Sequence, residues 1–267
     1  EGKSYPKREV AVNWANTPKV LEVKDLTLPK NGGGYLLNNV SFDLHKGEVL
    51  GIYGLLGAGR SEVFECIMGM RPTHTGKIIL NGKEIQVGTV PDQIAKGFAW
   101  LPEDRQRDGL VQSMSIDKNM ALSNIGKYVN AFGLIDNKKE SAAVDEMIDE
   151  VHIKVANKDL PILSLSGGNQ QKVVFAKGAL TKPSIMLLDE PSRGIDIGAK
   201  TEIFKLIYQY AKKGVSLIVV SSELEEIIAI ADRILVLSNG VKTAEFTGKD
   251  ITQDNLVKAS YLGHHKA

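Results

Sequence analysis

One glycine-rich segment constrains the fold of this 267-residue chain more than any other feature. Residues 54–61, Gly-Leu-Leu-Gly-Ala-Gly-Arg-Ser, follow a short apolar stretch at 48–53 and precede a segment that we expect to be helical. Glycines allow the backbone to turn tightly, so that its N–H groups and the start of the helix can point at one place. The sequence therefore predicts a buried strand, a tight turn and a helix in immediate succession.

The same segment matches G-x-x-x-x-G-K-[ST], the pattern of a phosphate-binding loop, except at one position. Arg60 replaces the lysine; it keeps the positive charge, but its guanidinium is larger, planar and forked. Ser61 offers a hydroxyl to Mg²⁺, whereas Glu62 adds a carboxylate that would repel phosphates. We expect weak nucleotide binding or slow turnover here, the alternative being a tight turn without a ligand. The predicted nucleotide-binding residues are Gly54, Gly57, Ala58, Gly59, Arg60, Ser61 and Glu62.

A pair of carboxylates, Asp189 and Glu190, ends the apolar run 184–188. Such a run is typical of a strand buried on both faces. At the end of that strand, Asp189 is placed to hold Mg²⁺ directly or through water, and Glu190 to orient or deprotonate an attacking water. Acidic pairs are more often solvated loop residues, and the five apolar residues before this pair argue against that alternative.

A third motif, Leu-Ser-Gly-Gly-Asn at 165–169, precedes an apolar helix predicted at 173–180. Ser166 is suited to be the N-cap of that helix, and two glycines expose backbone donors at its positive end. The alternative is an ordinary capped helix with a glycine hinge. The position of the motif about twenty residues before the carboxylate pair argues against that alternative.

Strand and helix signals alternate along most of the chain and predict the α/β fold class. Strands that alternate with helices imply a largely parallel sheet covered on both faces, beside which the early strands form a smaller antiparallel portion. Between 116 and 160 the periodicity is helical throughout, which indicates an inserted helical subdomain. The predicted strands are 20–28, 40–44, 48–53, a hairpin at 77–85, 184–188, 216–220 and 234–237; the predicted helices are 89–97, 197–211, 224–231, one from 61 and one from 252.

Composition argues against several other classes of protein. Apolar residues make up 43% and charged residues 24%, as in ordinary globular domains. The net charge of +1 gives no support for a nucleic-acid partner, and the single Cys66 fits a reducing compartment. No run of about 18 apolar residues is present, so we predict that any work at a membrane is done through a partner. Residues 1–19 are polar and are interpreted as a linker or tail.

Taken in order, the phosphate loop, Leu-Ser-Gly-Gly at 165–168 and Leu-Leu-Asp-Glu-Pro at 187–191 resemble the motifs of the ATP-binding cassette family. The resemblance implies a P-loop nucleotide-binding domain over 20–267, with a RecA-like, mostly parallel core sheet, an antiparallel β portion and a helical subdomain at about 112–165. It implies ATP and Mg²⁺ as cofactors. It also implies two cassettes paired head to tail, with Ser166, Gly167, Gly168 and Asn169 as the signature that completes the partner's site.

Departures from the family pattern indicate which branch of the family the chain resembles. Glu103, in Trp-Leu-Pro-Glu-Asp-Arg, stands where the Q-loop glutamine is expected, and Ser222 stands where the switch histidine is expected. Together with Arg60 and Glu62, they resemble the second, C-terminal cassette of monosaccharide importers, in which two cassettes are fused in one polypeptide. Residues 5–9 resemble the linker between those two cassettes.

This resemblance implies an asymmetric ATPase that powers sugar import. Its own site keeps Glu190 as the catalytic residue but lacks the lysine and the histidine, while its intact signature serves the other cassette. The implied partners are an N-terminal cassette of the same polypeptide, transmembrane permease subunits and, indirectly, a periplasmic or lipid-anchored sugar-binding protein, at the cytoplasmic face of the membrane. The alternatives are a nucleotide-binding regulatory module that does not hydrolyse ATP, and a soluble cassette ATPase acting on ribosomes or DNA.

Overall fold

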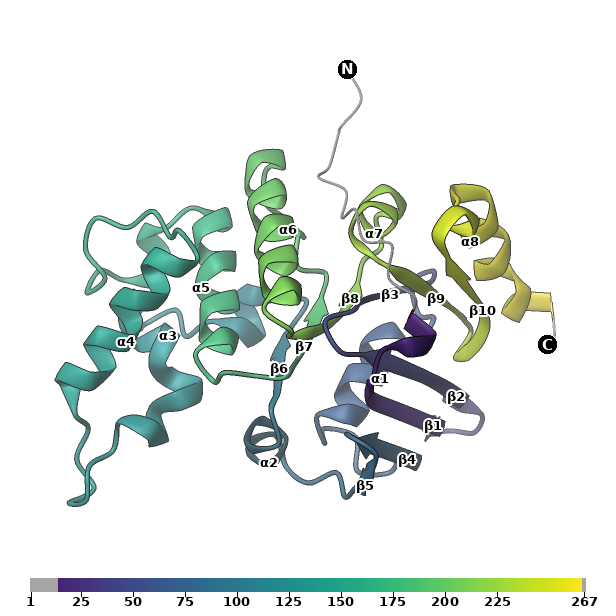
Figure 1. Ribbon diagram of the computed structural model, residues 1–267, viewed down its shortest axis with the longest axis horizontal. Coiled ribbons are helices and arrows are strands. Elements are labelled where there is room, and N and C mark those ends of the chain that lie inside the picture. The colour runs from purple at the N-terminus through teal and green to yellow at the C-terminus, as the bar shows by residue number, and fades with distance from the viewer. Residues whose placement is uncertain (1–13, 266–267) are drawn as a thin grey trace.

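The computed structural model describes residues 14–265 and contains two β-sheets (Figure 1). Within these residues, the larger sheet has the strand order β10-β9-β3-β8-β7-β6. All its neighbouring pairs are parallel except β9 with β10, which form a hairpin. Its strands are β3 (Val49–Tyr53), β6 (Phe98–Leu101), β7 (Ile185–Asp189), β8 (Ser216–Val220), β9 (Arg233–Ser238) and β10 (Val241–Thr247). The predicted, mostly parallel core sheet is confirmed.

The smaller sheet is antiparallel throughout, with the order β2-β1-β4-β5. Its strands are β1 (Lys19–Pro29), β2 (Tyr35–His45), β4 (Thr75–Leu80) and β5 (Lys83–Ile85). The turn between β1 and β2 contains three consecutive glycines at positive φ, Gly32, Gly33 and Gly34, as its glycine-rich sequence predicts. The predicted antiparallel portion is therefore present beside the core sheet.

Both faces of the core sheet are buried, which explains its continuous apolar strands. In β3, Val49 and Tyr53 belong to one hydrophobic cluster, whereas Leu50 and Ile52 belong to the other. The first cluster includes residues of α5, α6 and α7, and the second includes residues of α1 and of the antiparallel sheet. The covering helices are α1 (Arg60–Ile67), α2 (Val90–Ala95), α5 (Gly167–Ala179), α6 (Ile197–Lys212), α7 (Leu224–Ile230) and α8 (Gln253–Tyr261).

The segment predicted to be helical forms a separate group of helices at one end of the molecule (Figure 1). It contains α3 (Ile116–Ala121), a 3-10 helix (Leu122–Tyr128) and α4 (Asn137–Glu150), and α3 packs on both α4 and α5. The short remaining elements are 3-10 turns at Trp14–Asn16, Ile162–Ser164, Gly248–Asp250 and Leu262–His265, and a π-helical turn at Arg105–Gly109. No helix within residues 14–265 is both long and apolar enough to cross a bilayer.

Two features differ from the sequence prediction. The strand β6 was not predicted, because Phe98–Leu101 is only four residues long and has no room for a clear alternation. It pairs in parallel with β7 and forms an edge of the core sheet. The predicted linker 1–19 lies largely outside the described residues, which begin at residue 14, and Lys19 already belongs to β1.

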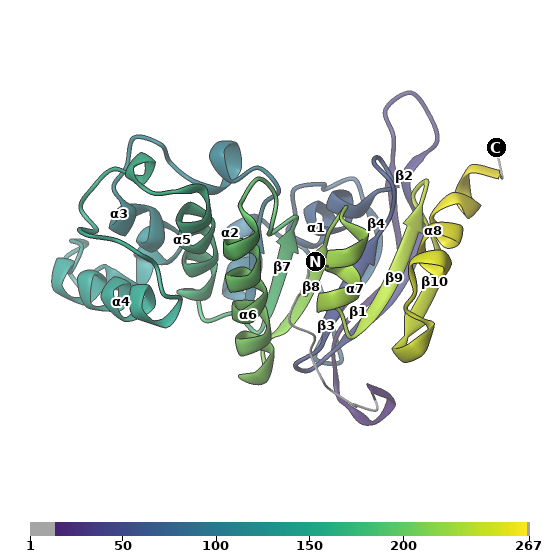
Figure 2. The same cartoon turned by 90° about the horizontal axis from the view of Figure 1, so that it is seen from above.

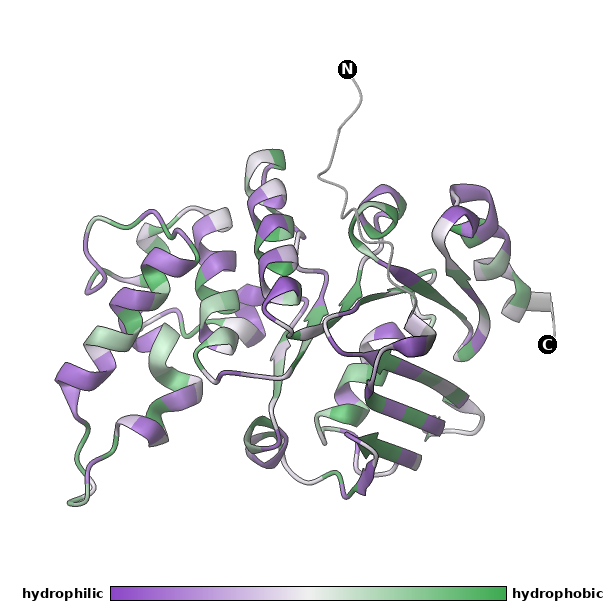
Figure 3. Ribbon diagram, in the orientation of Figure 1, coloured by the Kyte–Doolittle hydropathy of each residue, from purple (hydrophilic) through white to green (hydrophobic). Residues whose placement is uncertain are grey.

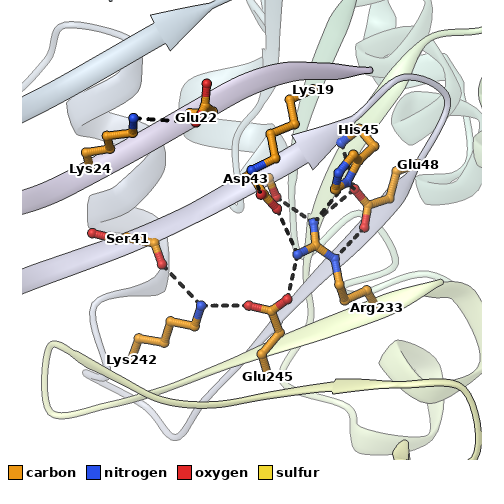
Figure 4. Close-up of polar contacts among 10 residues, drawn as sticks. All are labelled: Lys19, Glu22, Lys24, Ser41, Asp43, His45, Glu48, Arg233, Lys242 and Glu245. Atoms are coloured by element: carbon orange, nitrogen blue, oxygen red, sulfur yellow. Dashed lines mark hydrogen bonds and ion pairs between the residues drawn. The ribbon is translucent and has the colours of Figure 1, made fainter. Parts of the chain in front are cut away.

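A buried arginine that the sequence reasoning missed ties the two sheets together (Figure 4). Arg233, at the start of β9, lies 2.7 Å from Glu48 Oε1, 2.9 Å from Asp43 Oδ1 and 2.5 Å from Glu245 Oε1. Burial opposes its charge, but the bonds with Glu48 and Glu245 outweigh burial and raise the pKa of Arg233. The cluster joins β2, the turn before β3, β9 and β10, and so fixes the antiparallel sheet against the core.

Candidate functional site

The predicted phosphate loop lies between the end of β3 and the start of α1. Gly57 and Gly59 have φ angles of 78° and 97°, a conformation that favours glycine. A Cβ at Gly54 would lie 2.5 Å from the carbonyl oxygen of Leu237, so that position also requires glycine. Among the described residues, the N–H groups of Gly57 and Gly59 have no acceptor. The loop therefore leaves backbone donors available at the N-terminus of a helix, as an anion site requires.

Asp189 ends β7 beside this loop and is 2% exposed. Burial raises the pKa of Asp189 to about 6, against the opposing effect of a hydrogen bond from Ser61. Its Oδ1 has no hydrogen-bond partner within residues 14–265. A buried carboxylate oxygen without a partner, beside a serine hydroxyl, fits the oxygen ligands of Mg²⁺, which often takes its other ligands from phosphates and water.

Glu190 contacts two other predicted site residues. Its Oε1 lies 3.3 Å from Nη1 of Arg60, and the two side chains are only 7% and 10% exposed. The contact is an ion pair without hydrogen-bond geometry, since Nη1 makes no hydrogen bond among the described residues. Ser222 Oγ donates to Oε2 of Glu190 over 3.2 Å. The backbone of Glu190 has φ 47°, so its placement also carries backbone strain.

A buried cluster behind Ser222 was missed by sequence reasoning. Glu226, 1% exposed, accepts hydrogen bonds from Ser192, from Ser221 at 3.2 Å and from Lys200 at 2.6 Å. Burial opposes the charge of Lys200, but bonds with Glu223 and Glu226 outweigh it and raise the pKa of Lys200 to about 12. This cluster links the loop after Glu190, the segment containing Ser222, and α6. Its only sequence signal was a lysine on the buried face of the predicted helix 197–211.

Glu103, predicted at the Q-loop position, contacts the loop that follows Glu190. It forms an ion pair with Arg193, in the loop after Glu190, and both side chains are exposed. Arg105 donates to the carbonyl oxygens of Arg193 at 2.8 Å and Gly194 at 3.2 Å. The side chains of Glu103 and Arg105 therefore contact the side chain of Arg193 and main-chain carbonyl groups of the loop 192–196. Neither contact brings Glu103 to Asp189 or Glu190.

The predicted signature lies at the start of α5. Ser166 is the N-cap residue as expected, but its side chain makes no capping bond; Asn169 Nδ2 instead donates to its Oγ over 3.1 Å. A Cβ at Gly168 would lie 2.5 Å from Cβ of Ala199, so this glycine allows α5 and α6 to pack closely. Gly167 and Asn169 are partly exposed, and Ser166 is exposed.

The signature and the phosphate loop do not form one site in this chain. Figures 1 and 2 place α5 and α1 on opposite sides of β7. Asp189 lies beside Ser61 and Glu190 contacts Arg60, both in the loop 54–61, and Ser222 bonds to Glu190, while Ser166 lies on another part of the surface. The structure thus has one half-site with a loop and two carboxylates, and a second, separate half-site at the start of α5.

Comparison with known proteins agrees with the motifs. Residues 37–193 match the family model described as ABC transporter. The chain is 40% identical over 266 residues to the xylose import ATP-binding protein XylG of Escherichia coli K12, and equally to that of Shigella boydii serotype 4. The alignment covers 97% of this chain but 52% of those proteins, so the chain spans about half the length of these relatives.

Solved structures share the fold. A nucleotide-free ATP-binding cassette from an ABC transporter superposes with a TM-score of 0.77 at 22% identity, covering 90% of this chain and 95% of that one. A second ABC transporter cassette, in its ADP conformation, gives a TM-score of 0.78 at 20% identity, covering 92% and 99%. At these identities the likeness concerns the fold, and it confirms the predicted cassette architecture.

Proposed function

This chain belongs to the ABC transporter family, and from that premise we propose that it is the second, asymmetric cassette of a sugar importer. Cassettes of this family are ATPases that bind ATP with Mg²⁺. In the proposal, the chain holds MgATP at its own phosphate loop and presents Ser166 to Asn169 to a partner cassette. The 40% identity to proteins described as xylose import ATP-binding proteins supports a sugar as cargo.

One observation carries the nucleotide half of the proposal. The unpartnered Oδ1 of Asp189 lies next to Ser61 and the loop 54–59, whose backbone leaves donors open. Ser61 and Asp189 would hold Mg²⁺, which would offset the charge of the phosphates when bound. The loop would orient the nucleotide through its N–H groups, and Glu190 would hold the attacking water or take its proton.

The asymmetry rests on what already contacts Glu190. Arg60 and Ser222 engage its two carboxylate oxygens. While Arg60 and Ser222 occupy both carboxylate oxygens, Glu190 has no oxygen left with which to orient or deprotonate a water. Glu190 can accept a proton from water only after Arg60 moves away, for example toward the phosphates. We therefore propose slow turnover at this site and faster turnover at the partner site, to which this chain gives Ser166.

The permease partner is proposed to dock in a groove beside the helical part. A cavity of about 620 Å³ lies between α2, β6 and α5, lined by Val90, Ile94, Trp100 and Lys177 among others. Its lining combines apolar residues with the charged Glu65, Arg107 and Asp108, as suits a short amphipathic helix. In the proposal, permease helices bind here at the cytoplasmic face of the membrane, and a sugar-binding protein acts through the permease.

The decisive experiment compares two substitutions in the longer polypeptide that the proposal supposes. Ser166→Arg places a bulky cation where the partner's γ-phosphate region would be completed, and should abolish transport. Glu190→Gln in the same polypeptide should leave most transport, because the slow site contributes little. If Ser166→Arg transports normally, or if Glu190→Gln is the more damaging change, the asymmetric proposal is wrong.

A second candidate is a regulatory module that binds nucleotide but does not hydrolyse it, and the Arg60–Glu190 ion pair favours it. The ATPase activity of this chain alone, measured over a wide range of protein concentration, shows first whether its own site can turn over. Activity that rises with concentration and is lost in Glu190→Gln supports a self-pairing ATPase. Activity indistinguishable from Glu190→Gln at every concentration means that the chain alone is a half-module, and the regulatory module is then supported only if Glu190→Gln also leaves ATPase activity unchanged in the longer polypeptide.

A further inference from the structure

An exposed apolar loop projects from the helical part of the molecule, far from the nucleotide site (Figure 1). This tip, residues 129–135, connects the 3-10 helix Leu122–Tyr128 to α4. Phe132 is 88% exposed and Leu134 66%, the highest values among the large apolar residues of the helical part, and Val129 and Ile135 are each exposed by more than 40%. Figure 3 shows hydrophobic residues at its end. Four large apolar side chains together on a convex loop are unusual unless something covers them.

The tip is held in shape by its own hydrogen bonds. Asn130 Oδ1 accepts from the N–H groups of Phe132 at 2.9 Å and Leu134 at 3.1 Å. The N–H of Asn130 donates to the carbonyl oxygen of Leu134 over 2.8 Å, and Gly133 adopts φ 78° to close the turn. The loop therefore cannot easily fold Phe132 and Leu134 back onto the protein. Their exposure is a property of the fold of this turn.

Cations flank the tip. Residues 127–139 contain three lysines, Lys127, Lys138 and Lys139, against one acidic residue, Asp136. Lys127 and Lys139 donate to main-chain carbonyl oxygens, at 3.3 and 3.1 Å, which orient the ammonium groups without neutralising them. Asp136 is engaged as the N-cap of α4, where it accepts from the N–H of Lys139. The tip thus combines an apolar end with a positive base.

We propose that the tip inserts into an anionic lipid surface, with Phe132 and Leu134 at the boundary between headgroups and acyl chains and the lysines at the headgroups. Large apolar groups beside lysines suit this boundary, because lysine can keep its ammonium in the headgroup layer. The tip is convex, so it needs no preformed groove in a protein partner; a bilayer adapts to it. In Figure 1 the tip and α2, which lines the 620 Å³ cavity, lie on the same lower side of the molecule. The inference does not depend on the nucleotide site.

Vesicle binding tests the proposal directly on this chain. The probes are vesicles of phosphatidylglycerol and phosphatidylcholine in equal parts, and vesicles of phosphatidylcholine alone. We expect binding to the anionic vesicles, and a fall in affinity of about tenfold or more for Phe132→Ser/Leu134→Ser, because both side chains leave the lipid. The matched control is Tyr261→Ser/Leu262→Ser, which removes two neighbouring side chains of 51% and 55% exposure at the end of α8 and should bind as the parent does.

The lysines are tested separately. Lys138→Gln/Lys139→Gln should bind several-fold more weakly at low salt, and the difference should shrink as salt screens the headgroup charge. The proposal is overturned if the parent chain ignores anionic vesicles, if the tip variant binds as tightly as the parent, or if the control loses as much as the tip variant. Capture of permease subunits by the tip without any vesicle binding would also overturn it, and would assign the tip to a protein contact.

Discussion

The two half-sites of this molecule differ in how deeply their side chains are buried and in how many contacts these side chains make within the chain. Around the phosphate loop, Asp189 and Glu190 are buried, and Glu190 already contacts both Arg60 and Ser222. At the start of α5, Ser166 is exposed and its hydroxyl contacts only Asn169 among the described residues. The side chains of the first half-site are therefore already bound to other residues of this chain. The side chains of the second are exposed or partly exposed to solvent and have few contacts within the chain.

This difference suggests a division of work between the two regions. A buried carboxylate with several partners depends on its surroundings for stability, so substitutions there should change both folding and chemistry. An exposed serine without a structural bond should change binding to another molecule and little else. Stability measurements can therefore separate the two half-sites without any knowledge of the partner.

The largest effect is expected for Glu226→Ala, in the cluster that supports the first half-site. The substitution removes the acceptor of Ser192 and Ser221 and one of the two carboxylates that pair with the buried Lys200. Leaving a buried cation only partly neutralised costs about 3 kcal/mol. Urea unfolding should therefore show a free energy of unfolding lower by about that amount.

Glu225→Ala is the matched control, one residue away on the exposed side of α7. It should change the free energy of unfolding by less than about 0.5 kcal/mol. If Glu226→Ala costs as little as Glu225→Ala, the buried cluster contributes little to stability. The interpretation that the half-site at the phosphate loop depends on buried contacts for its stability is then wrong.

Cys66, on the helix behind the phosphate loop, gives an intermediate effect that depends on pH. Burial raises the pKa of its thiol from near 9 to about 12. Because the folded pKa is the higher one, the contribution to stability is fully present below pH 9 and is lost as pH rises toward 12. Between pH 8 and pH 10 the loss should be about 1.4 kcal/mol relative to Cys66→Ala, which has no thiol to ionise.

The two stability curves against pH, measured by urea unfolding, test this directly. The parent chain should fall more steeply than Cys66→Ala above pH 9. Parallel curves over that range would mean that the thiol ionises in the folded state, and that α1 is more open to water than its packing indicates.

Sequence patterns predicted most of the fold and the positions of the motifs that form the candidate site, for a physical reason. The strands at 184–188 and 216–220, and the motifs at 54–61 and 165–169, are contiguous stretches in which local periodicity and glycine content carry the signal. The cluster of Glu226, Lys200 and Ser192 is different, because its members come from three segments. No local pattern reports such contacts.

Two side chains show the same limit. Ser166 was predicted as a capping residue from its position, and the position is right, but the direction of its hydroxyl depends on Asn169. Glu103 was predicted at the Q-loop position by resemblance, and its ion pair with Arg193 is a contact that no local pattern reports. The sequence predicts the secondary-structure position of a residue. The hydrogen-bond or ion-pair partner of its side chain depends on how segments distant in the sequence pack together.

The smallest stability effect is expected at Ser166, and it is the sharpest test of the half-site at the start of α5. An N-cap serine that bonds to the helix typically contributes about 1 kcal/mol, but Ser166 makes no such bond. Ser166→Ala should therefore lower the free energy of unfolding by less than about 0.5 kcal/mol. Thr252→Ala is the matched control, since Thr252 Oγ1 accepts from the N–H of Asn255 at the start of α8, and it should cost about 1 kcal/mol. A larger loss of stability for Ser166→Ala than for Thr252→Ala would mean that the Ser166 hydroxyl stabilises α5. The residues at the start of α5 would then have a structural role in this chain, and not only a role in binding a partner.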